Sequence, residues 1–340
     1  MRKVSAIPAR SSPRPGSAVR FPGRIAFTPS RGSALASVSS LDEASAFLAE
    51  ASAEGRQVRI GEDLTTDGLA RVLEHEAGDL TCTVESGVRL SELDAALALH
   101  GQRLSLDPPG DPTIGALLAE NASGPLRHRF GAPRDLVLGV TLVLADGTIA
   151  NAGGKVVKNV AGYDLGRLVC GSRGRLAFIA RASFRLHPLP SASRTLVVET
   201  EEPAATVAAL LRSQLEPSSL DVLHPGRVAM LFEGSPLAVQ AQVATALVLV
   251  GARENGAEVW AETRDRQRAA TRRIDFPPGE LDRILGGLSE AIVRPSAGAA
   301  YTPHPEPNGS EPRSDEGAAA RRRLEERIRR ALDPNGIFSP

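Results

Sequence analysis

The chain has few cysteines, few aromatic residues and no long apolar run. Its two cysteines, Cys82 and Cys170, among 340 residues exclude a disulfide framework, a four-thiolate zinc site and an iron–sulfur cluster held by this chain alone. The longest apolar candidate, from Leu237 to Val250, is interrupted by two glutamines and is shorter than the roughly 20 residues that span a bilayer. These absences predict a soluble, cytoplasmic protein without a direct membrane span.

The charge balance argues against a further class of protein. The chain has 40 basic and 40 acidic residues, so its formal net charge is zero, and we expect no nucleic-acid binding driven by a global positive field. The six histidines are scattered without the spacing of metal ligands, which predicts no metal site. Three of the basic residues are lysines, namely Lys3, Lys155 and Lys158, and two of these share one glycine-rich segment.

The first 34 residues form a basic tail rich in serine and proline. No acidic residue occurs before Asp42, whereas seven basic residues do, a composition typical of a mitochondrial presequence. A disordered, solvated tail is the alternative, and the five prolines of residues 1–34 favour it because they interrupt any amphipathic helix. We expect a tail, with the presequence interpretation still open.

Apolar periodicity predicts mixed helices and strands up to residue 190. The run His187-Pro188-Leu189-Pro190 ends the last predicted strand, and we place a domain boundary there. Strands are predicted at 79–86, 137–144 and 176–186, and helices at 41–53, 65–74 and 91–100.

Residues 191–294 predict a second domain with a different order of elements. The order is β-α-β-β-α-β, which is typical of a ferredoxin-like unit. A loop rich in proline and glycine over 295–317 and an amphipathic helix with a tail over 318–340 follow it. The unit consists of predicted strands at 195–199, 220–223, 228–232 and 257–260 and predicted helices at 204–213 and 236–250.

The segment from Asp107 to Ile179 carries most of the functional signal. It is rich in non-periodic runs of Gly, Ser, Thr and Asn, which allow main-chain N–H groups to approach a bound anion. The runs alternate with predicted strands, so the strand ends would bring them together. This composition favours a phosphate-bearing ligand, and the alternative is that the glycines only make turns.

Residues 35–190 resemble the FAD-binding domain of the vanillyl-alcohol oxidase and p-cresol methylhydroxylase (PCMH) type. Thr113-Ile114-Gly115 and Asn121-Ala122-Ser123-Gly124-Pro125 are similar to the flavin-contacting motif of that family. The run Lys158-Asn159-Val160-Ala161-Gly162-Tyr163-Asp164-Leu165 and the ending Asp333-Pro334-Asn335-Gly336-Ile337-Phe338-Ser339-Pro340 resemble one branch of it, the small FAD-binding subunit of glycolate oxidase.

The resemblance implies an α+β fold with two domains. A PCMH-type FAD-binding domain of two subdomains would span residues 35–190, and a ferredoxin-like cap domain over residues 191–294 would cover the isoalloxazine ring. After the loop at 295–317, the helix and tail at 318–340 would return to the FAD-binding domain. The implied cofactor is non-covalent FAD, because no histidine lies near Gly61 to form a covalent bond from that loop.

The resemblance also implies which residues contact FAD. Lys158 is suited to an electrostatic role. In a chain with so few lysines, an arginine would serve if charge alone mattered, but a compact ammonium differs from a planar guanidinium. The alternative is a solvated loop charge. For Asp164 the alternative is a helix N-cap. The candidates are Thr113, Ile114 and Gly115 along the flavin or its ribityl chain; Asn121, Ser123 and Gly124 at the diphosphate or the polar edge of the ring; Gly171 and Ile179 at the adenine end; and Gly61, Pro108, Lys158, Tyr163 and Asp164 around them.

One stretch departs from the family pattern. The family has an early diphosphate loop of consecutive glycines, whereas the matching place here reads Gly61-Glu62-Asp63-Leu64-Thr65. Two carboxylates beside a diphosphate would each cost about 1 kcal/mol or more. The loop therefore argues for weaker FAD binding than the other motifs imply.

The resemblance predicts an FAD-dependent oxidoreductase subunit of a glycolate-type 2-hydroxy-acid dehydrogenase. The flavin would accept a hydride and pass electrons to a partner, so a larger FAD-binding subunit and an iron–sulfur subunit are the expected partners. No catalytic base can be assigned, although His128 lies in the motif region. The alternative is a cofactor-free scaffold subunit of the same kind of complex, and a reductase of the UDP-sugar precursor type is a third interpretation.

Overall fold

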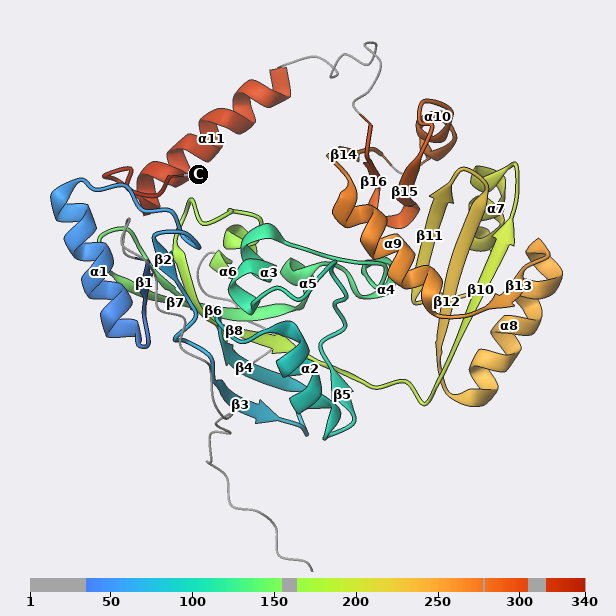
Figure 1. Ribbon diagram of the computed structural model, residues 1–340, viewed down its shortest axis with the longest axis horizontal. Coiled ribbons are helices and arrows are strands. Elements are labelled where there is room, and N and C mark those ends of the chain that lie inside the picture. The colour runs from blue at the N-terminus through green and yellow to red at the C-terminus, as the bar shows by residue number, and fades with distance from the viewer. Residues whose placement is uncertain (1–34, 155–163, 278, 305–315, 340) are drawn as a thin grey trace, which may run out of the picture.

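The structure is a computed structural model that describes residues 35–154, 164–277, 279–304 and 316–339. It consists of two lobes, each built on its own antiparallel sheet, as Figure 1 shows. Among the described residues, no helix combines the length and the apolar character needed to cross a bilayer.

The first lobe is built on a five-stranded sheet. Its order is β3-β4-β8-β6-β7, and the strands predicted at 79–86, 137–144 and 176–186 are confirmed as β4, β6 and β8 in that sheet. Helices α2 (Leu90–Ala98) and α3 (Ile114–Glu120) pack on one face through buried leucines. The strands are β3 (Val72–Glu76), β4 (Thr81–Glu85), β6 (Val137–Val143), β7 (Ile149–Gly153) and β8 (Phe178–Arg185).

The opposite face is covered by both ends of the described chain. Helix α1 (Leu41–Glu54), the parallel pair β1 (Ala36–Ser37) and β2 (Leu64–Thr65), and the C-terminal tail share one apolar cluster. Ile337 and Phe338 of the tail are fully buried. The Val58 N–H donates to the Ile337 carbonyl over 2.7 Å, so the tail lies within the first lobe.

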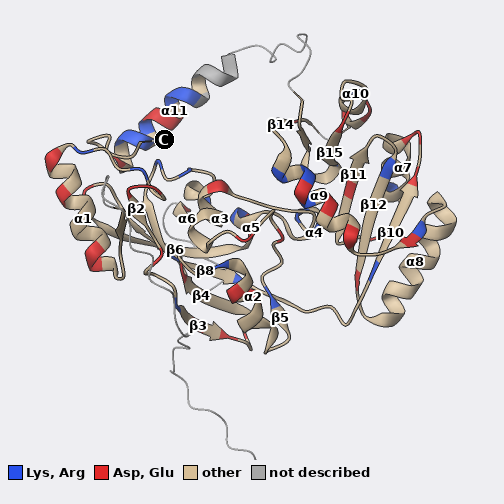
Figure 2. Ribbon diagram, viewed as in Figure 1, with Lys and Arg blue, Asp and Glu red and all other residues tan. Residues whose placement is uncertain are grey.

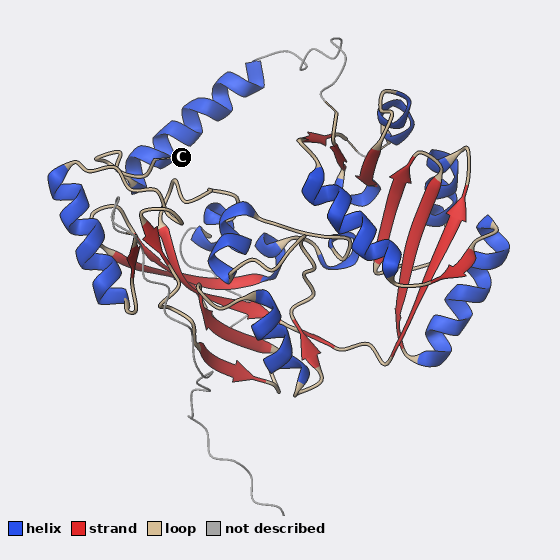
Figure 3. Ribbon diagram, in the orientation of Figure 1, coloured by secondary structure: helices blue, strands red, loops and turns tan. Residues whose placement is uncertain are grey.

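The second lobe contains the predicted ferredoxin-like unit. Its seven-stranded sheet has the order β13-β10-β12-β11-β15-β16-β14. Along the chain, four of these strands and the two helices that cover one face of the sheet follow the order β-α-β-β-α-β (Figure 3). This order confirms the prediction. The unit comprises β10 (Ala192–Glu199), α7 (Pro203–Arg212), β11 (Ser219–His224), β12 (Arg227–Gly234), α8 (Pro236–Val250) and β13 (Arg253–Asn255), and it is extended by α9 (Glu258–Ala269), β14 (Arg272–Asp275), α10 (Leu281–Gly286), β15 (Ala291–Arg294) and β16 (Ala299–Thr302).

Several short elements and one long helix complete the described chain. The long helix, α11 (Glu316–Leu332), leads back from the second lobe to the first (Figure 1). The short elements are β5 (Gln102–Arg103), α4 (Arg127–Phe130), α5 (Pro133–Leu136), α6 (Leu165–Val169), β9 (His187–Pro188) and the 3-10 turn η1 (Pro295–Ala297).

Three predicted segments differ in the structure. Residues 65–74 form a turn and the start of β3 instead of a helix, and residues 257–260 open helix α9 instead of forming a strand. Both segments are too short for their few apolar residues to distinguish a period of 3.6 from a period of 2. Strand β16 lies inside the range 295–317 predicted as a loop, and all four of its residues are buried, so the second sheet extends to Thr302.

We expect the substitution Phe338→Ala to destabilise the first lobe. The side chain is fully buried beside α1 and β2, and truncating a buried Phe costs about 3–5 kcal/mol of unfolding free energy. Urea unfolding followed by circular dichroism measures the loss. Leu324→Ala on α11, where the side chain is 55% exposed, is the control and should change the free energy of unfolding by less than about 0.5 kcal/mol. If the two substitutions changed that free energy equally, the placement of the tail would be contradicted.

Candidate functional site

A cavity of about 440 Å³ opens in the first lobe. Its wall combines the loop before and after β2, the first turns of α3, the turn before β8 and the start of β8 itself. That size and this mixture of apolar and polar groups suit a small-molecule ligand. The lining residues are Ile60, Gly61, Thr65, Thr66, Asp67, Thr113, Gly115, Ala116, Ala119, Glu120, Arg173, Gly174, Ala177 and Ile179.

The acidic loop that departs from the family pattern is neutralised locally. Gly61 has a φ of +98° and turns the chain. The Asp63 carboxylate accepts the Arg59 N–H over 2.9 Å and the Arg59 Nε over 3.3 Å, and these hydrogen bonds lower the pKa of Asp63. Glu62 forms an ion pair with the same guanidinium. Neither carboxylate lines the cavity, so the repulsion expected from the sequence is reduced.

Helix α3 forms the second wall. The Thr113 hydroxyl caps the helix by accepting the Ala116 N–H over 3.3 Å. Gly115 donates its N–H to the Ser86 carbonyl over 2.7 Å, and a Cβ at this position would lie 3.1 Å from the Ser86 Cβ. The glycine therefore allows α3 to pack closely against the end of β4.

The turn over residues 171–174 closes the cavity. Its Gly171 and Arg173 N–H groups donate to the carbonyls of Leu118 and Ala119 over 3.0 and 2.8 Å. Gly174 packs against Ile60, whose Cβ would lie 3.1 Å from an added Cβ. The turn thus joins the end of α3 to the loop on the other side of the cavity.

The structure brings four of the predicted site residues to one cavity. Gly61, Thr113, Gly115 and Ile179 line it, and Gly171 lies in the turn that closes it. Their predicted contacts with FAD remain predictions.

The other predicted site residues lie elsewhere. The Ile114 side chain is fully buried in the core, and Asn121 ends α3 with its Oδ1 accepting the Arg134 N–H over 3.2 Å. Asp164 caps α6 by accepting the Arg167 N–H over 3.0 Å, which is the alternative considered for it. Lys158 and Tyr163 lie outside the described residues.

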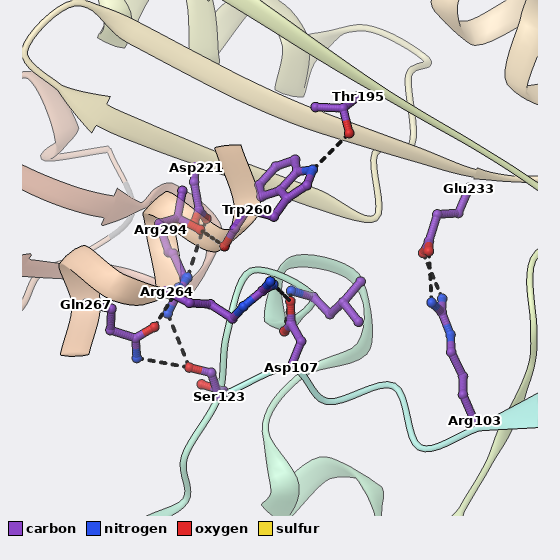
Figure 4. Close-up of polar contacts among 12 residues, drawn as sticks. Arg103, Asp107, Ser123, Thr195, Asp221, Glu233, Trp260, Arg264, Gln267 and Arg294 are labelled. Atoms are coloured by element: carbon purple, nitrogen blue, oxygen red, sulfur yellow. Dashed lines mark hydrogen bonds and ion pairs between the residues drawn. The ribbon is translucent and has the colours of Figure 1, made fainter. Parts of the chain in front are cut away.

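Pro108, Ser123 and Gly124 lie near the boundary between the lobes. The Ser123 carbonyl accepts N–H groups from Gln267 over 3.1 Å and from Arg294 over 3.3 Å, as Figure 4 shows. A side chain at Gly124 would overlap the Asp107 carbonyl oxygen. Ser123 therefore holds the second lobe against the first, whereas Gly124 allows close packing against Asp107 within the first lobe.

Two carboxylates belong to this boundary, Asp221, which is fully buried, and Asp107, which is 20% exposed. Asp107 accepts the Leu126 N–H over 2.9 Å and lies 3.6 Å from the Arg264 guanidinium, while Asp221 lies 3.4 Å from Arg294. Helix α9, which supplies Arg264, carries both acidic and basic residues (Figure 2). Burial raises the pKa of Asp107 to about 7 and also raises the pKa of Asp221. No pattern in the sequence predicted this cluster, because its members come from five separate segments.

The predicted histidine candidate is a weak base. His128 Nδ1 lies 2.8 Å from the Ser296 hydroxyl, and burial lowers the pKa of His128 to about 4. None of the six histidines, all of which lie in the described ranges, lines the 440 Å³ cavity. The histidines therefore supply no base at the wall of this cavity.

Comparisons with known proteins agree with this geometry. The model of the FAD binding domain family matches residues 61–153. Over 300 residues the chain is 30% identical to the glycolate oxidase subunit GlcE of Escherichia coli, covering 79% of this chain and 83% of that protein. Over 160 residues it is 36% identical to the glycolate oxidase subunit GlcD of Bacillus subtilis, covering 46% of this chain. A solved alkyldihydroxyacetonephosphate synthase shares the fold, with a TM-score of 0.66 at 15% identity over 89% of this chain and 76% of that one.

Fold and matched domain together define an FAD-binding oxidoreductase of the PCMH type. Within that class, the chain belongs to the family of the glycolate oxidase subunit GlcE. It spans only 34% of the length of the GlcD relative and 28% of a similar D-lactate dehydrogenase from Archaeoglobus fulgidus.

The cavity fits the cofactor that this family implies. The Thr65 hydroxyl at its wall is buried and has no hydrogen-bond partner within the described residues, and such orphaned polar atoms indicate an unfilled binding role. Arg173 supplies a cation, and Ala116, Ala119 and Ala177 supply small apolar contacts. A dinucleotide offers both kinds of surface, a charged diphosphate and apolar rings.

We expect the stability of the protein to depend on pH through Asp107. Burial raises the pKa of Asp107 to about 7 in the folded state from an ordinary 3.8, so the folded state binds the proton more tightly than the unfolded state does. The free energy of unfolding therefore falls as the pH rises from about 4 to about 7, because each unit of pKa difference corresponds to about 1.4 kcal/mol. Asp107→Asn should therefore become more stable relative to the native protein as the pH rises through this window. Urea midpoints followed by the fluorescence of Trp260, the single tryptophan, test this; a pH-independent difference would contradict it.

Proposed function

We propose that this chain is the FAD-binding oxidoreductase subunit of a glycolate-type 2-hydroxy-acid dehydrogenase. The observation that carries the proposal is the cavity formed by Gly61, Thr113, Gly115 and Ile179, in the part of the chain that matches the FAD binding domain. The similarity to GlcE along most of both chains supports it.

Within this proposal the chain's own residues bind and orient the cofactor. Bound FAD supplies the capacity to accept a hydride from an alcohol carbon. The loop from Ile60 to Asp67 and helix α3 hold it from two sides of the cavity, and the turn before β8 closes the third side. The second lobe is fixed above residues 107–126 by the Asp107 and Ser123 contacts.

The proposal includes partner subunits. With two cysteines, this chain cannot hold an iron–sulfur cluster by itself, so electrons would pass to a larger FAD-binding subunit and an iron–sulfur subunit. A cytoplasmic location belongs to the same proposal.

We expect the purified protein to carry FAD. The visible absorption spectrum should show flavin bands, and acid precipitation should release the flavin because it is bound non-covalently. Ala116→Phe places a ring in the cavity at an exposed wall position and should abolish the bands. Ala98→Phe, at an exposed position on α2 outside the cavity, is the matched control and should retain them.

The outcome that contradicts the proposal is a protein without flavin bands that also fails to gain them when FAD is added. The chain would then be a cofactor-free scaffold subunit of the same kind of complex. Copurification of such a protein with a separate flavoprotein would favour that alternative directly.

A further inference from the structure

The loop at Gly61 and the start of α3, two parts of the cavity wall, use their main-chain donors internally. In the loop, the N–H of Gly61 donates to the Leu64 carbonyl over 2.8 Å, and the N–H groups of Glu62, Asp63 and Leu64 all donate to the Arg59 carbonyl over 2.8–3.4 Å. This loop therefore offers no N–H from residues 61–64 to a ligand.

The start of α3 is equally occupied. The N–H groups of Ile114 and Gly115 donate to the carbonyls of Val88 and Ser86 over 2.9 and 2.7 Å, and the Ala116 N–H donates to the Thr113 hydroxyl. Main-chain amides usually bind phosphate where they are left free at a turn or a helix end. The amides of Gly61, Gly115 and Ala116 at the cavity wall are therefore not free to bind an anion.

Arg173 is the cation that the cavity offers. Among the fourteen described residues that line it, the ionisable ones are Asp67, Glu120 and Arg173. The carboxylates outnumber the guanidinium, so a bound anion depends on that single positive charge. Within the described residues, the Arg173 side chain has no hydrogen-bond or ion-pair partner, whereas Arg59 on the facing loop is paired twice.

The backbone holds Arg173 in an unfavourable conformation. Its φ is +53°, in the left-handed region that costs a residue with a Cβ roughly 1–2 kcal/mol. A glycine would adopt this conformation with less strain. Strain of this kind is found where a side chain has a role that outweighs it, and the Arg173 N–H bond to Ala119 keeps the side chain at the cavity.

We propose that Arg173 binds the diphosphate of the dinucleotide, in place of the free main-chain amides that the loop at Gly61 lacks. The inference rests on the proposed function, since the ligand is the FAD named there. A guanidinium forms paired, charge-assisted hydrogen bonds with phosphate oxygens, so one side chain supplies both the charge and two directed donors.

The first test compares two arginines of the same turn. Arg173→Gln should weaken FAD binding about tenfold or more, as expected for the loss of charge-assisted hydrogen bonds. Arg175→Gln removes the same charge two residues away, at an exposed position that does not line the cavity, and should change the dissociation constant less than about twofold. Quenching of FAD fluorescence on titration into the flavin-free full-length chain measures both. Equal dissociation constants for the two variants would overturn the inference.

A second variant separates binding from folding. Arg173→Gly removes the side chain and the left-handed strain together, so the flavin-free protein should unfold at the same temperature as the native protein or higher, while its affinity for FAD falls as in Arg173→Gln. Differential scanning fluorimetry gives the unfolding temperature. A lower unfolding temperature accompanied by the same loss of affinity would make Arg173 a structural residue and refute the proposal.

ADP and adenosine locate the contact on the ligand. Arg173→Gln should weaken the binding of ADP, which carries the diphosphate, and leave the binding of adenosine unchanged, as measured by competition with FAD or by calorimetry. Equal losses for both would place the arginine on the adenosine and overturn the assignment. A native protein that binds neither FAD nor ADP would refute the proposed function itself, whereas native binding of both with an unaffected Arg173→Gln variant would refute the Arg173 assignment alone.

Discussion

The position of helix α3 is the constraint on which the cavity depends. At its start, the N–H groups of Ile114 and Gly115 are bound to carbonyls at the end of β4, and at its end the carbonyls of Leu118 and Ala119 hold the turn before β8. A helix of seven residues is too short to be stable alone, so these bonds at both ends fix its place. They also fix the distance between the two sides of the cavity.

The segment that follows α3 also contacts the second lobe. Residues 121–126 leave α3 at Asn121 and run directly to the contacts of Ser123 with Gln267 and Arg294 (Figure 4). A second link, between Arg103 and Glu233, is bidentate at 2.8 and 2.7 Å. Buried ion pairs contribute little net stability, but a partner left alone is costly. The contacts therefore select one orientation of the lobes rather than add much to stability.

Sequence reasoning worked where a pattern was long and failed where it was short. The alternation over residues 176–186 predicted β8, and the order of elements after residue 190 predicted the ferredoxin-like unit. Residues 65–74 and 257–260 were misassigned because a few apolar residues fit either period. The ion pairs Asp107–Arg264 and Asp221–Arg294 had no signal, since charge pairing across distant segments leaves no local periodicity.

The glycine motifs predicted a candidate site but not what the glycines do there. Glycine permits close approach of any backbone, whether to a ligand or to another segment of the same chain. Gly115 and Gly124 make room for Ser86 and Asp107 of the protein itself, and the neighbouring amides are bound internally. Close packing of the chain against itself therefore accounts for these glycines, and the same packing brings the strand ends around the cavity. Our proposal assigns polar recognition of a ligand there to a side chain at the wall, Arg173.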